Sequence, residues 1–587
     1  MLSFRAIGPT DARWRRIPPF FCTMKGNMMD RREFALRAAA FAFAAACGKI
    51  TFAGGGNAGF ERVFAKTDSP KNPPIPDGKR PSGGLDYFRL DGDPDGVLLK
   101  FPKFAGKLKN HKNPKLKLCF GNALENRDSF SLFARSAKDG RILARLNLVN
   151  LFGFEPVRFD IPLEDAEEIE RYGIVVTYAR MERKDAKFIS KGDPVCLFAE
   201  SAAEKLDAHA PHLLLYGEGF DPKAAFRKNF LSLNCILPFG WMSGCQTEGL
   251  RELAESGDAE AESALRAHLD FFLDDEKGVV FNDPLSNLCE NGKFHSEEDF
   301  LPFVAITSLY PEHKAVQMFL KWAAPRMKRN AKTPAVRRFL STEGCYTYAY
   351  PLMKIAISRG DPKLAQFALD EILARIGRLA GPDGGICQRA PANQKPGLKN
   401  WGRGAAWYML GLVQTLRALG SSPLKNAGLQ GAEKIKKALA GGAEYLARFQ
   451  NPDGSWHCFV DDPATLPESS GTAGIAAAFA LGAEAGLLDK SYMPRAEKAL
   501  EWFMSPQNIE PDGFSKNVTQ SNRIGDAFQR SGYRVIMPIS SGLAAHIIAV
   551  KTRGDGKNGD GWFRLTAFGT HENTVEAMQR VKKLLSK

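Results

Sequence analysis

Residues 401–407 read WGRGAAW and residues 468–473 read ESSGTA, and both stretches stand where a loop turns into an apolar helical run. Each places charged, hydroxyl or aromatic side chains at the start of that predicted helix. The same arrangement, a polar or aromatic segment before an apolar helix, recurs about six times from residue 240 onward. This rhythm predicts a barrel of paired helices whose functional groups gather at one rim.

The chain from residue 221 keeps the apolar spacing of helices. First helices of successive pairs begin about 45 to 65 residues apart, as six stacked helical hairpins require. Pro-Asp-Gly turns at 382–384, 452–454 and 511–513 each follow the second helix of a pair, and this chemistry favours tight turns. We therefore predict an all-α (α/α)6 barrel over residues 221–587. Its twelve helices are predicted at 246–256, 258–274, 297–309, 312–326, 345–359, 362–380, 403–419, 431–450, 470–486, 493–505, 536–552 and 572–586.

Residues 85–220 have the pattern of β-strands. Runs such as GVLLKF (96–101) and GIVVTY (173–178) are apolar or alternate, with turn residues between them. They predict a β-sandwich ahead of the barrel, so the fold class is multidomain, β followed by all-α. Residues 51–84 are rich in Pro, Gly and Lys and are predicted to form a linker.

The first 50 residues have the features of an export signal. The segment DRREFAL (30–36) precedes the apolar run 38–46, which is typical of a twin-arginine signal. Cys47, which follows three alanines, is a candidate lipid-attachment site. No uncharged apolar run of 18 residues follows residue 50, so we expect an exported protein, periplasmic or extracellular, without a transmembrane segment.

The composition and charge of the chain limit the classes of ligand that it is expected to bind. The chain is 44% hydrophobic and carries a formal net charge of +14, spread along the sequence without a dense basic run. This excess suits an acidic ligand such as a uronate-containing glycan, and no motif supports nucleic-acid binding. The ten cysteines include no CxxC spacing, so we expect no zinc site and no cofactor.

Six hairpins closed into a ring would bring the N-termini of the first helices to one rim. Helix N-termini favour anionic ligands, aromatic rings provide flat surfaces for sugars, and neighbouring carboxyl groups can hold a proton near neutral pH. Each acid also has a structural interpretation, because acids are common at helix starts. The candidate catalytic carboxyls are Glu343, Asp299 and Glu468. The candidate binding residues at this rim are Trp401, Arg403, Trp407, His295, Glu298, Tyr346, Tyr348, Ser470 and Thr472, together with Trp241, Gln246, Glu248, Arg534 and Ser540.

Three segments, 401–408, 450–456 and 467–473, resemble the unsaturated rhamnogalacturonyl hydrolases and unsaturated glucuronyl hydrolases, glycoside hydrolase families 105 and 88. The resemblance is clearest over residues 340–510 and implies an (α/α)6 barrel. In those families the WGRG segment heads a barrel helix and contributes to a uronate-binding cleft. A β-sandwich before the barrel looks more like exported bacterial uronidases such as the family 154 β-glucuronidases.

The resemblance also implies a proton donor. These families place a catalytic aspartate at the head of the helix that here contains residues 346–351, where the nearest acid is Glu343. A histidine common in the families appears here as Gln388, which the resemblance places among the substrate-binding residues. Glu343 is thus the expected donor, and Arg403 is expected to pair with the substrate carboxylate. Candidate partners of the donor are Asp299, Glu298 and Glu468.

The predicted function is an exported glycoside hydrolase that releases a saturated or unsaturated glucuronyl or galacturonyl residue from an acidic glycan. One alternative is a polysaccharide lyase on a similar toroid, in which Tyr346 or Tyr348 or His295 removes a proton α to the uronate while Arg403 neutralises the carboxylate. A second alternative is a non-catalytic uronate-glycan-binding protein. The segment 449–456 also matches a repeated motif of triterpene cyclases, but the acidic cluster those enzymes need is missing from the sequence.

Overall fold

The computed structural model describes residues 59–76, 79–90, 92, 95–181, 194–282 and 293–555. The predicted export signal, Cys47 and the predicted helix at 572–586 lie outside these ranges. Among the residues described, no helix has the length and apolar character needed to cross a membrane.

The N-terminal part of the described chain consists of antiparallel sheets. One four-stranded sheet has the order β1 (Phe60–Phe64), β10 (His212–Tyr216), β4 (Lys115–Gly121) and β7 (Pro156–Ile161). A second has the order β3 (Val97–Leu99), β8 (Ile174–Arg180), β5 (Asn126–Ser136) and β6 (Ile142–Leu151). A further pair is formed by β2 (Tyr87–Leu90) and β9 (Val195–Phe198).

Both four-stranded sheets contribute to one buried apolar cluster. Leu118 of β4 and Leu132 of β5 are fully buried in it, as expected for antiparallel strands with one face on a core. The range predicted as a linker contains β1, which pairs along its whole length with β10 and buries Val63. Glu61 and Arg62 interrupt the apolar character of this short strand, so its alternation is weak in the sequence.

The C-terminal part is an (α/α) barrel, and every predicted helix within the described residues is present. Its inner helices are α4 (Trp241–Glu255), α6 (Phe303–Leu309), α8 (Tyr350–Arg359), α10 (Gly402–Gly420), α12 (Ser469–Glu484) and α15 (Ile539–Asp555). Its outer helices are α5 (Ala259–Asp270), α7 (Lys314–Asn330), α9 (Pro362–Leu379), α11 (Ala432–Ala447) and α13 (Tyr492–Phe503). Three short helices complete the described set, α2 (Ala166–Tyr172), α3 (Pro222–Phe230) and α14 (Asp526–Arg530).

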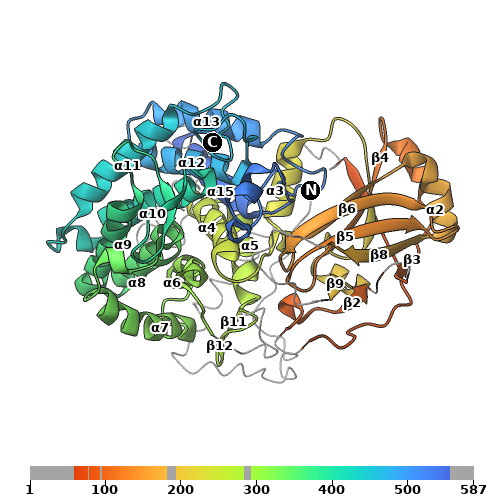
Figure 1. The fold of residues 1–587 in the computed structure, drawn as a ribbon, viewed down its shortest axis with the longest axis horizontal. Helices are drawn as coiled ribbons and strands as arrows, with labels where there is room; N and C mark the ends of the chain where they lie inside the picture. The colour runs from red at the N-terminus through yellow and green to blue at the C-terminus, as the bar shows by residue number, and fades with distance from the viewer. Residues whose placement is uncertain are drawn as a thin grey trace, which may run out of the picture. The chain divides into compact units, whose positions relative to one another are not determined.

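The inner helices form a closed ring. Each contacts the next one along the chain, and α15 returns to contact α4. Each outer helix packs on the inner helix that precedes it, and Figure 1 shows α11 and α13 outside α10 and α12. The contact between α4 and α15 is close because it is made at glycines. A Cβ atom at Gly542 would lie 2.1 Å from the carbonyl oxygen of Cys245.

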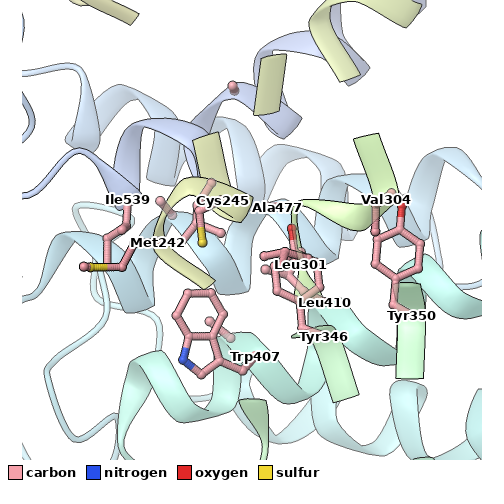
Figure 2. Close-up of a cluster of buried hydrophobic side chains, with 14 of the residues drawn as sticks. Met242, Cys245, Leu301, Val304, Tyr346, Tyr350, Trp407, Leu410, Ala477 and Ile539 are labelled. Atoms are coloured by element: carbon pink, nitrogen blue, oxygen red, sulfur yellow. The ribbon is translucent and has the colours of Figure 1, made fainter. Parts of the chain in front are cut away.

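The interior of the ring is packed with side chains from all six inner helices or the turns that begin them (Figure 2). Tyr346 stacks between Tyr350 and Trp407, with ring centroids 6.0 and 5.9 Å away. Because this core is filled, a binding site must lie at one end of the ring rather than along its axis.

Candidate functional site

The N-terminal rim of the ring is formed by the starts of the inner helices and the loops before them. Two short elements shape it beside α6 and α8, the 3₁₀ turn η6 (Glu297–Phe300) and the π-helical turn η8 (Cys345–Ala349). A small sheet of β13 (Leu340–Ser341), β14 (Cys387–Ala390) and β15 (Gly397–Lys399) lies next to η8. These elements bring residues far apart in sequence to the same rim.

Glu343 lies at this rim, two residues before η8, and is 7% exposed. Gln388 of β14 donates its Nε2 hydrogens to both carboxylate oxygens, at 2.7 Å each. Asn522 Nδ2 donates to Oε1 at 3.4 Å. Burial raises the pKa of Glu343, although hydrogen bonds to the charged form, from its own backbone and from Gln388, oppose the effect. Gln388, predicted as a substrate-binding residue, is thus a hydrogen-bond partner of Glu343 in the structure.

Glu298, on η6, forms a second carboxyl group coupled to Glu343. Burial first, and then the negative charge of Glu343, raises the pKa of Glu298 to about 7. About a third of its side chain is exposed, so solvent reaches it. Two neighbouring carboxyl groups cannot both ionise freely, and the pair therefore keeps a proton to higher pH than either would alone. This is the proton chemistry that glycoside cleavage needs.

Arg403, predicted to pair with the substrate carboxylate, is buried in the structure and donates to backbone carbonyls. Its side chain is 3% exposed. Nη1 donates to the carbonyl of Thr519 at 2.6 Å and Nη2 to the carbonyl of Gln520 at 2.8 Å. The guanidinium also lies 4.7 Å from the ring centre of Trp401, and burial lowers its pKa. Both terminal nitrogens thus hold a neighbouring loop.

Glu468, predicted as a catalytic candidate, caps helix α12. Its two oxygens accept hydrogen bonds from the backbone N–H groups of Ser470 at 3.0 Å and Gly471 at 2.6 Å. The same carboxylate accepts from the Ser470 hydroxyl and from the backbone N–H of Thr519. Thr472 accepts from the backbone N–H of Trp456 at 2.9 Å. These contacts show that Glu468, Ser470 and Thr472 stabilise the start of helix α12 and the loops beside it.

Asp299 and His295 lie beside Glu298 but have other contacts. Asp299 Oδ2 accepts from the backbone N–H groups of His295 at 2.6 Å and Ser296 at 3.0 Å. With the Ser296 side chain this forms a capping box at the start of η6. His295 is exposed at the same turn.

The predicted aromatic residues belong mostly to the core beneath the rim. Trp401 and Trp407 are 2% and 3% exposed, and Tyr346 and Tyr348 are fully buried. Burial raises the pKa of both tyrosines. Of the tryptophans predicted at the rim, Trp241 is the more accessible, and its ring packs against Trp407.

Two side chains at the rim were missed by the sequence analysis. Asn522 donates to Glu343, and Arg523 approaches Glu298 with 3.8 Å between Nη2 and Oε2. Both lie on the 3₁₀ turn η10 (Asn522–Ile524), which precedes α14 and does not directly head the inner helix α15. A signal of the kind that marks the other inner-helix starts does not point to them, and the residues predicted at this part of the rim were Arg534 and Ser540. In the structure Ser540 donates to the Ser515 hydroxyl, and Arg534 donates to backbone carbonyls.

The opposite end of the ring holds a denser set of charges. Arg251 donates to Glu248 at 2.8 Å and to Glu252 at 2.9 Å. Arg417 and Arg553 also donate to Glu252, at 2.9 and 3.0 Å. Burial opposes ionisation of Glu252, yet the cations around it hold its pKa well below the usual range. A cavity of about 460 Å³ lies beside this network, at the C-terminal ends of α4, α10 and α12.

Two residues predicted at the N-terminal rim belong instead to the interior. Glu248 is fully buried within the charge network just described, and Gln246 is fully buried on α4. Both were placed at the rim because the predicted start of their helix, residue 246, is five residues later than the observed one. Among the described residues, no three His, Cys, Asp or Glu side chains are grouped so that they could hold a metal ion.

The fold and the rim define an (α/α)-barrel protein with a coupled carboxyl pair. Residues 345–549 match the family model described as Glycosyl Hydrolase Family 88. The match runs from η8 into α15 and includes the WGRG and ESSGTA segments. The predicted resemblance to uronyl glycoside hydrolases is therefore confirmed over this segment, and the match supports a glycoside hydrolase.

Solved structures of the same families are also similar to this chain. A possible member of the GH105 family from Salmonella enterica serovar Paratyphi A is 19% identical, over 56% of this chain and 84% of that one, with a TM-score of 0.43. An unsaturated glucuronyl hydrolase from Bacillus sp. GL1 is 16% identical, over 57% and 96%, with a TM-score of 0.40. At these TM-scores the likeness carries no argument about the site.

A short stretch matches curated proteins of another kind. It is 55% identical over 40 residues to LL-diaminopimelate aminotransferase of Methanosphaera stadtmanae, and 50% identical over 40 residues to that of Lachnospira eligens. Each match covers 7% of this chain and 10% of the aminotransferase. The chain thus spans about a tenth of the length of the curated relatives it matches, and no activity follows from the match.

Proposed function

We propose that this protein is a glycoside hydrolase that releases a terminal glucuronyl or galacturonyl residue from an acidic oligosaccharide or polysaccharide. The observation that carries the proposal is that Glu298 and Glu343 meet at the N-terminal rim, where the adjacent residues Arg523 and Asn522 contact one carboxyl group each. A pair with raised pKa values retains a proton near neutral pH, and the rim offers positive helix N-termini to an anionic sugar. The matched family agrees with this chemistry.

Glu343 is the proton donor in this proposal. Its burial favours the protonated form, while Gln388 and Asn522 fix the direction of its carboxyl group. Glu298, more exposed, accepts a proton from the attacking water. For a saturated uronoside the donated proton goes to the glycosidic oxygen. For an unsaturated uronyl residue it goes to the carbon–carbon double bond, and water adds to the neighbouring carbon.

The lyase alternative is less consistent with the positions of the tyrosines. A lyase base must reach the hydrogen α to the uronate carboxylate, but Tyr346 and Tyr348 are fully buried in the barrel core. The Tyr346 hydroxyl lies 3.3 Å from His546 Nε2, inside the ring rather than at its rim. Their raised pKa values further disfavour the phenolate that would act as base.

A panel of saturated and Δ4,5-unsaturated uronosides tests the proposal. We expect release of the terminal sugar. Loss of absorbance from the substrate double bond identifies an unsaturated substrate, and release without an absorbance change identifies a saturated one. New absorbance would show lyase chemistry, and no turnover on any member of the panel would favour the binding protein.

The remaining features of the predicted architecture and location belong to the same proposal. We infer that the two four-stranded sheets stack as a sandwich, because both contribute to one apolar cluster. A sixth hairpin would be completed by the helix predicted at 572–586. Export by the twin-arginine signal agrees with a glycan substrate outside the cytoplasm, and fractionation of the producing cells tests it. Lipid labelling at Cys47 tests the anchor.

A further inference from the structure

A loop before α15 links the rim to several other parts of the protein. We call residues 518–523 the rim loop. Thr519 donates its backbone N–H to Glu468 at 3.0 Å, and the carbonyls of Thr519 and Gln520 accept from Arg403. Val518 bridges to Val535. The rim loop is thus fixed on the barrel side by the segments 401–407 and 468–473.

The β region fixes the same loop from another side. Gln520 Nε2 donates to both carboxyl oxygens of Glu155, at 3.2 and 3.1 Å. Gln529 Nε2 donates to the carbonyls of Gln520 and Ser521, at 3.0 Å each. Trp401 Nε1 donates in turn to Gln529 Oε1 at 3.2 Å. Four consecutive loop residues, 518–521, are therefore held by contacts to different elements.

The two remaining residues of the rim loop face the carboxyl pair. Asn522 donates to Glu343. Arg523 reaches Glu298 at 3.8 Å and leaves 51% of its side chain exposed. A contact at that distance is weaker than a direct charge-assisted hydrogen bond, which lies near 2.7–2.9 Å. Arg523 thus combines a positive charge, solvent access and proximity to the pair.

Arg403 lacks the access that a substrate ligand needs. It is 3% exposed, its terminal nitrogens donate to backbone carbonyls, and aromatic rings lie against it. A ligand carboxylate could reach those nitrogens only by replacing the hydrogen bonds that hold the rim loop. The buried arginine is therefore suited to positioning, and the exposed one to binding.

We propose that Arg523 binds the carboxylate of the uronyl residue and determines the preference for acidic over neutral sugars, while Arg403 is a positioning residue that holds the rim loop. This inference rests on the proposed function, because it assigns a role within the same site. A guanidinium pairs with a carboxylate through two parallel hydrogen bonds. Arg523 in that role would place the sugar ring beside Glu298 and Glu343 and offset the repulsion between substrate and pair.

The test compares a uronoside with its methyl ester, which has the same ring and no negative charge. In wild type we expect a preference for the acid. Arg523→Gln should lower kcat/KM for the acid by roughly 10- to 100-fold, mainly through KM, because a hydrogen bond to a charged group is lost. kcat/KM for the ester should fall by a smaller factor, because Arg523 also faces Glu298, so the acid-to-ester ratio should fall. Arg523→Lys should restore part of the preference.

Two further variants separate binding from positioning. Arg403→Gln should lower turnover of acid and ester by the same factor and speed hydrogen exchange of the rim-loop amides. Arg530→Gln, in α14 and paired with Asp526 and Asp462, is the matched control and should change neither ratio nor exchange. An unchanged acid-to-ester ratio in Arg523→Gln would overturn the proposal. So would a ratio that Arg403→Gln abolishes while rim-loop exchange stays at the wild-type rate.

Failure of the proposed function can be recognised separately. If wild type turns over neither substrate, binding of methyl glucuronide to wild type and Arg523→Gln is measured by calorimetry. Binding to wild type that is lost in Arg523→Gln supports the role of Arg523 without hydrolysis. Equal binding by both proteins, or none by either, contradicts it.

Discussion

The two ends of the inner-helix ring hold similar residues in opposite electrostatic states. At the C-terminal end, Glu252 accepts from three arginines and has a strongly lowered pKa. At the N-terminal rim, Glu298 has a pKa raised to about 7 and its arginine stands 3.8 Å away. The first set is satisfied within the protein, whereas the second keeps a proton and an exposed cation available.

This difference separates structural charge from functional charge. A buried carboxylate surrounded by cations stabilises one protonation state and cannot exchange a proton near neutral pH. A carboxyl pair with little direct compensation does so readily. Glu252, which lines the cavity of about 460 Å³ at the C-terminal end, is therefore held in its ionised form. The rim has that chemistry, and the following predictions test the contrast.

The largest effect is expected at Glu343. Glu343→Gln keeps the shape and the hydrogen bond to Gln388 but removes the transferable proton. We expect kcat to fall by roughly 10²- to 10⁴-fold, the usual contribution of a general acid or base, with an unchanged unfolding temperature. Glu433→Gln, an exposed acid on α11, is the control and should retain full activity. Turnover within a few-fold of wild type in Glu343→Gln would remove this residue from the acid role.

Glu252 should matter for stability rather than activity. Glu252→Gln leaves Arg251, Arg417 and Arg553 without their shared anion, and breaking such a buried cluster costs about 3–5 kcal/mol. Urea unfolding should show this loss, while kcat/KM of the folded protein stays at the wild-type value. Glu255→Gln is the control on the same helix. Its half-exposed ion pair should contribute less than about 1 kcal/mol. A selective loss of activity in Glu252→Gln would place chemistry at this end.

Glu155, under the rim loop, should give stability a measurable pH dependence. Burial raises its pKa to about 8, against hydrogen bonds from Phe152 and Gln520. The folded state therefore keeps a proton that the unfolded chain loses near pH 4.5, so stability falls as pH rises from about 4.5 to 8.

The matching variant is Glu155→Gln, which cannot lose that proton. Relative to wild type, its free energy of unfolding should rise between pH 5 and pH 8.5 by roughly 1–3 kcal/mol. Denaturant unfolding at the two pH values measures the difference. Parallel pH profiles for the two proteins would show that Glu155 has an ordinary pKa.

The smallest effect is expected at Tyr346. Tyr346→Phe removes one hydrogen bond to His546, a buried group whose pKa burial lowers to about 3. The stability loss should be about 1 kcal/mol, and activity should stay within about threefold of wild type. A loss beyond 100-fold would revive the lyase alternative, in which this hydroxyl acts as base.

The sequence was sufficient for the barrel because helical periodicity and repeated Pro-Asp-Gly turns are local signals. It was also sufficient to predict Glu343 and Glu298 near one rim, since helix starts in a common phase must gather there, whereas Gln388 came only from the family resemblance. The sequence could not show that the Glu468 carboxylate caps helix α12. Nor could it show that the Arg403 guanidinium donates to backbone carbonyls. Those outcomes depend on the rim loop, which lies more than 50 residues away from Glu468 along the chain.

The proximity of Glu298 to Glu343 could not be predicted from the sequence either, because it too depends on contacts between distant segments. Which acids become neighbours depends on how η6 and η8 pack, and no local pattern encodes that contact. Asn522 and Arg523 were missed because they lie on a three-residue 3₁₀ turn, whose polar residues resemble those of any solvated turn. The strand β1 was missed because a short strand with two charges is recognisable only from its partner β10.

The pH dependence of kcat/KM on a uronoside tests the carboxyl pair most directly. The substrate carboxylate is ionised throughout pH 6–9, so a change in that range reports the protein. We predict that kcat/KM falls about tenfold per pH unit above roughly pH 7, as the pair loses its last proton. In Glu298→Gln the rate should be lower at every pH, because the proposed base is gone, and the decline of the remaining rate should move to lower pH, because Glu343 no longer has a negative neighbour. A rate that stays constant from pH 6 to 8.5 in wild type would contradict the assignment.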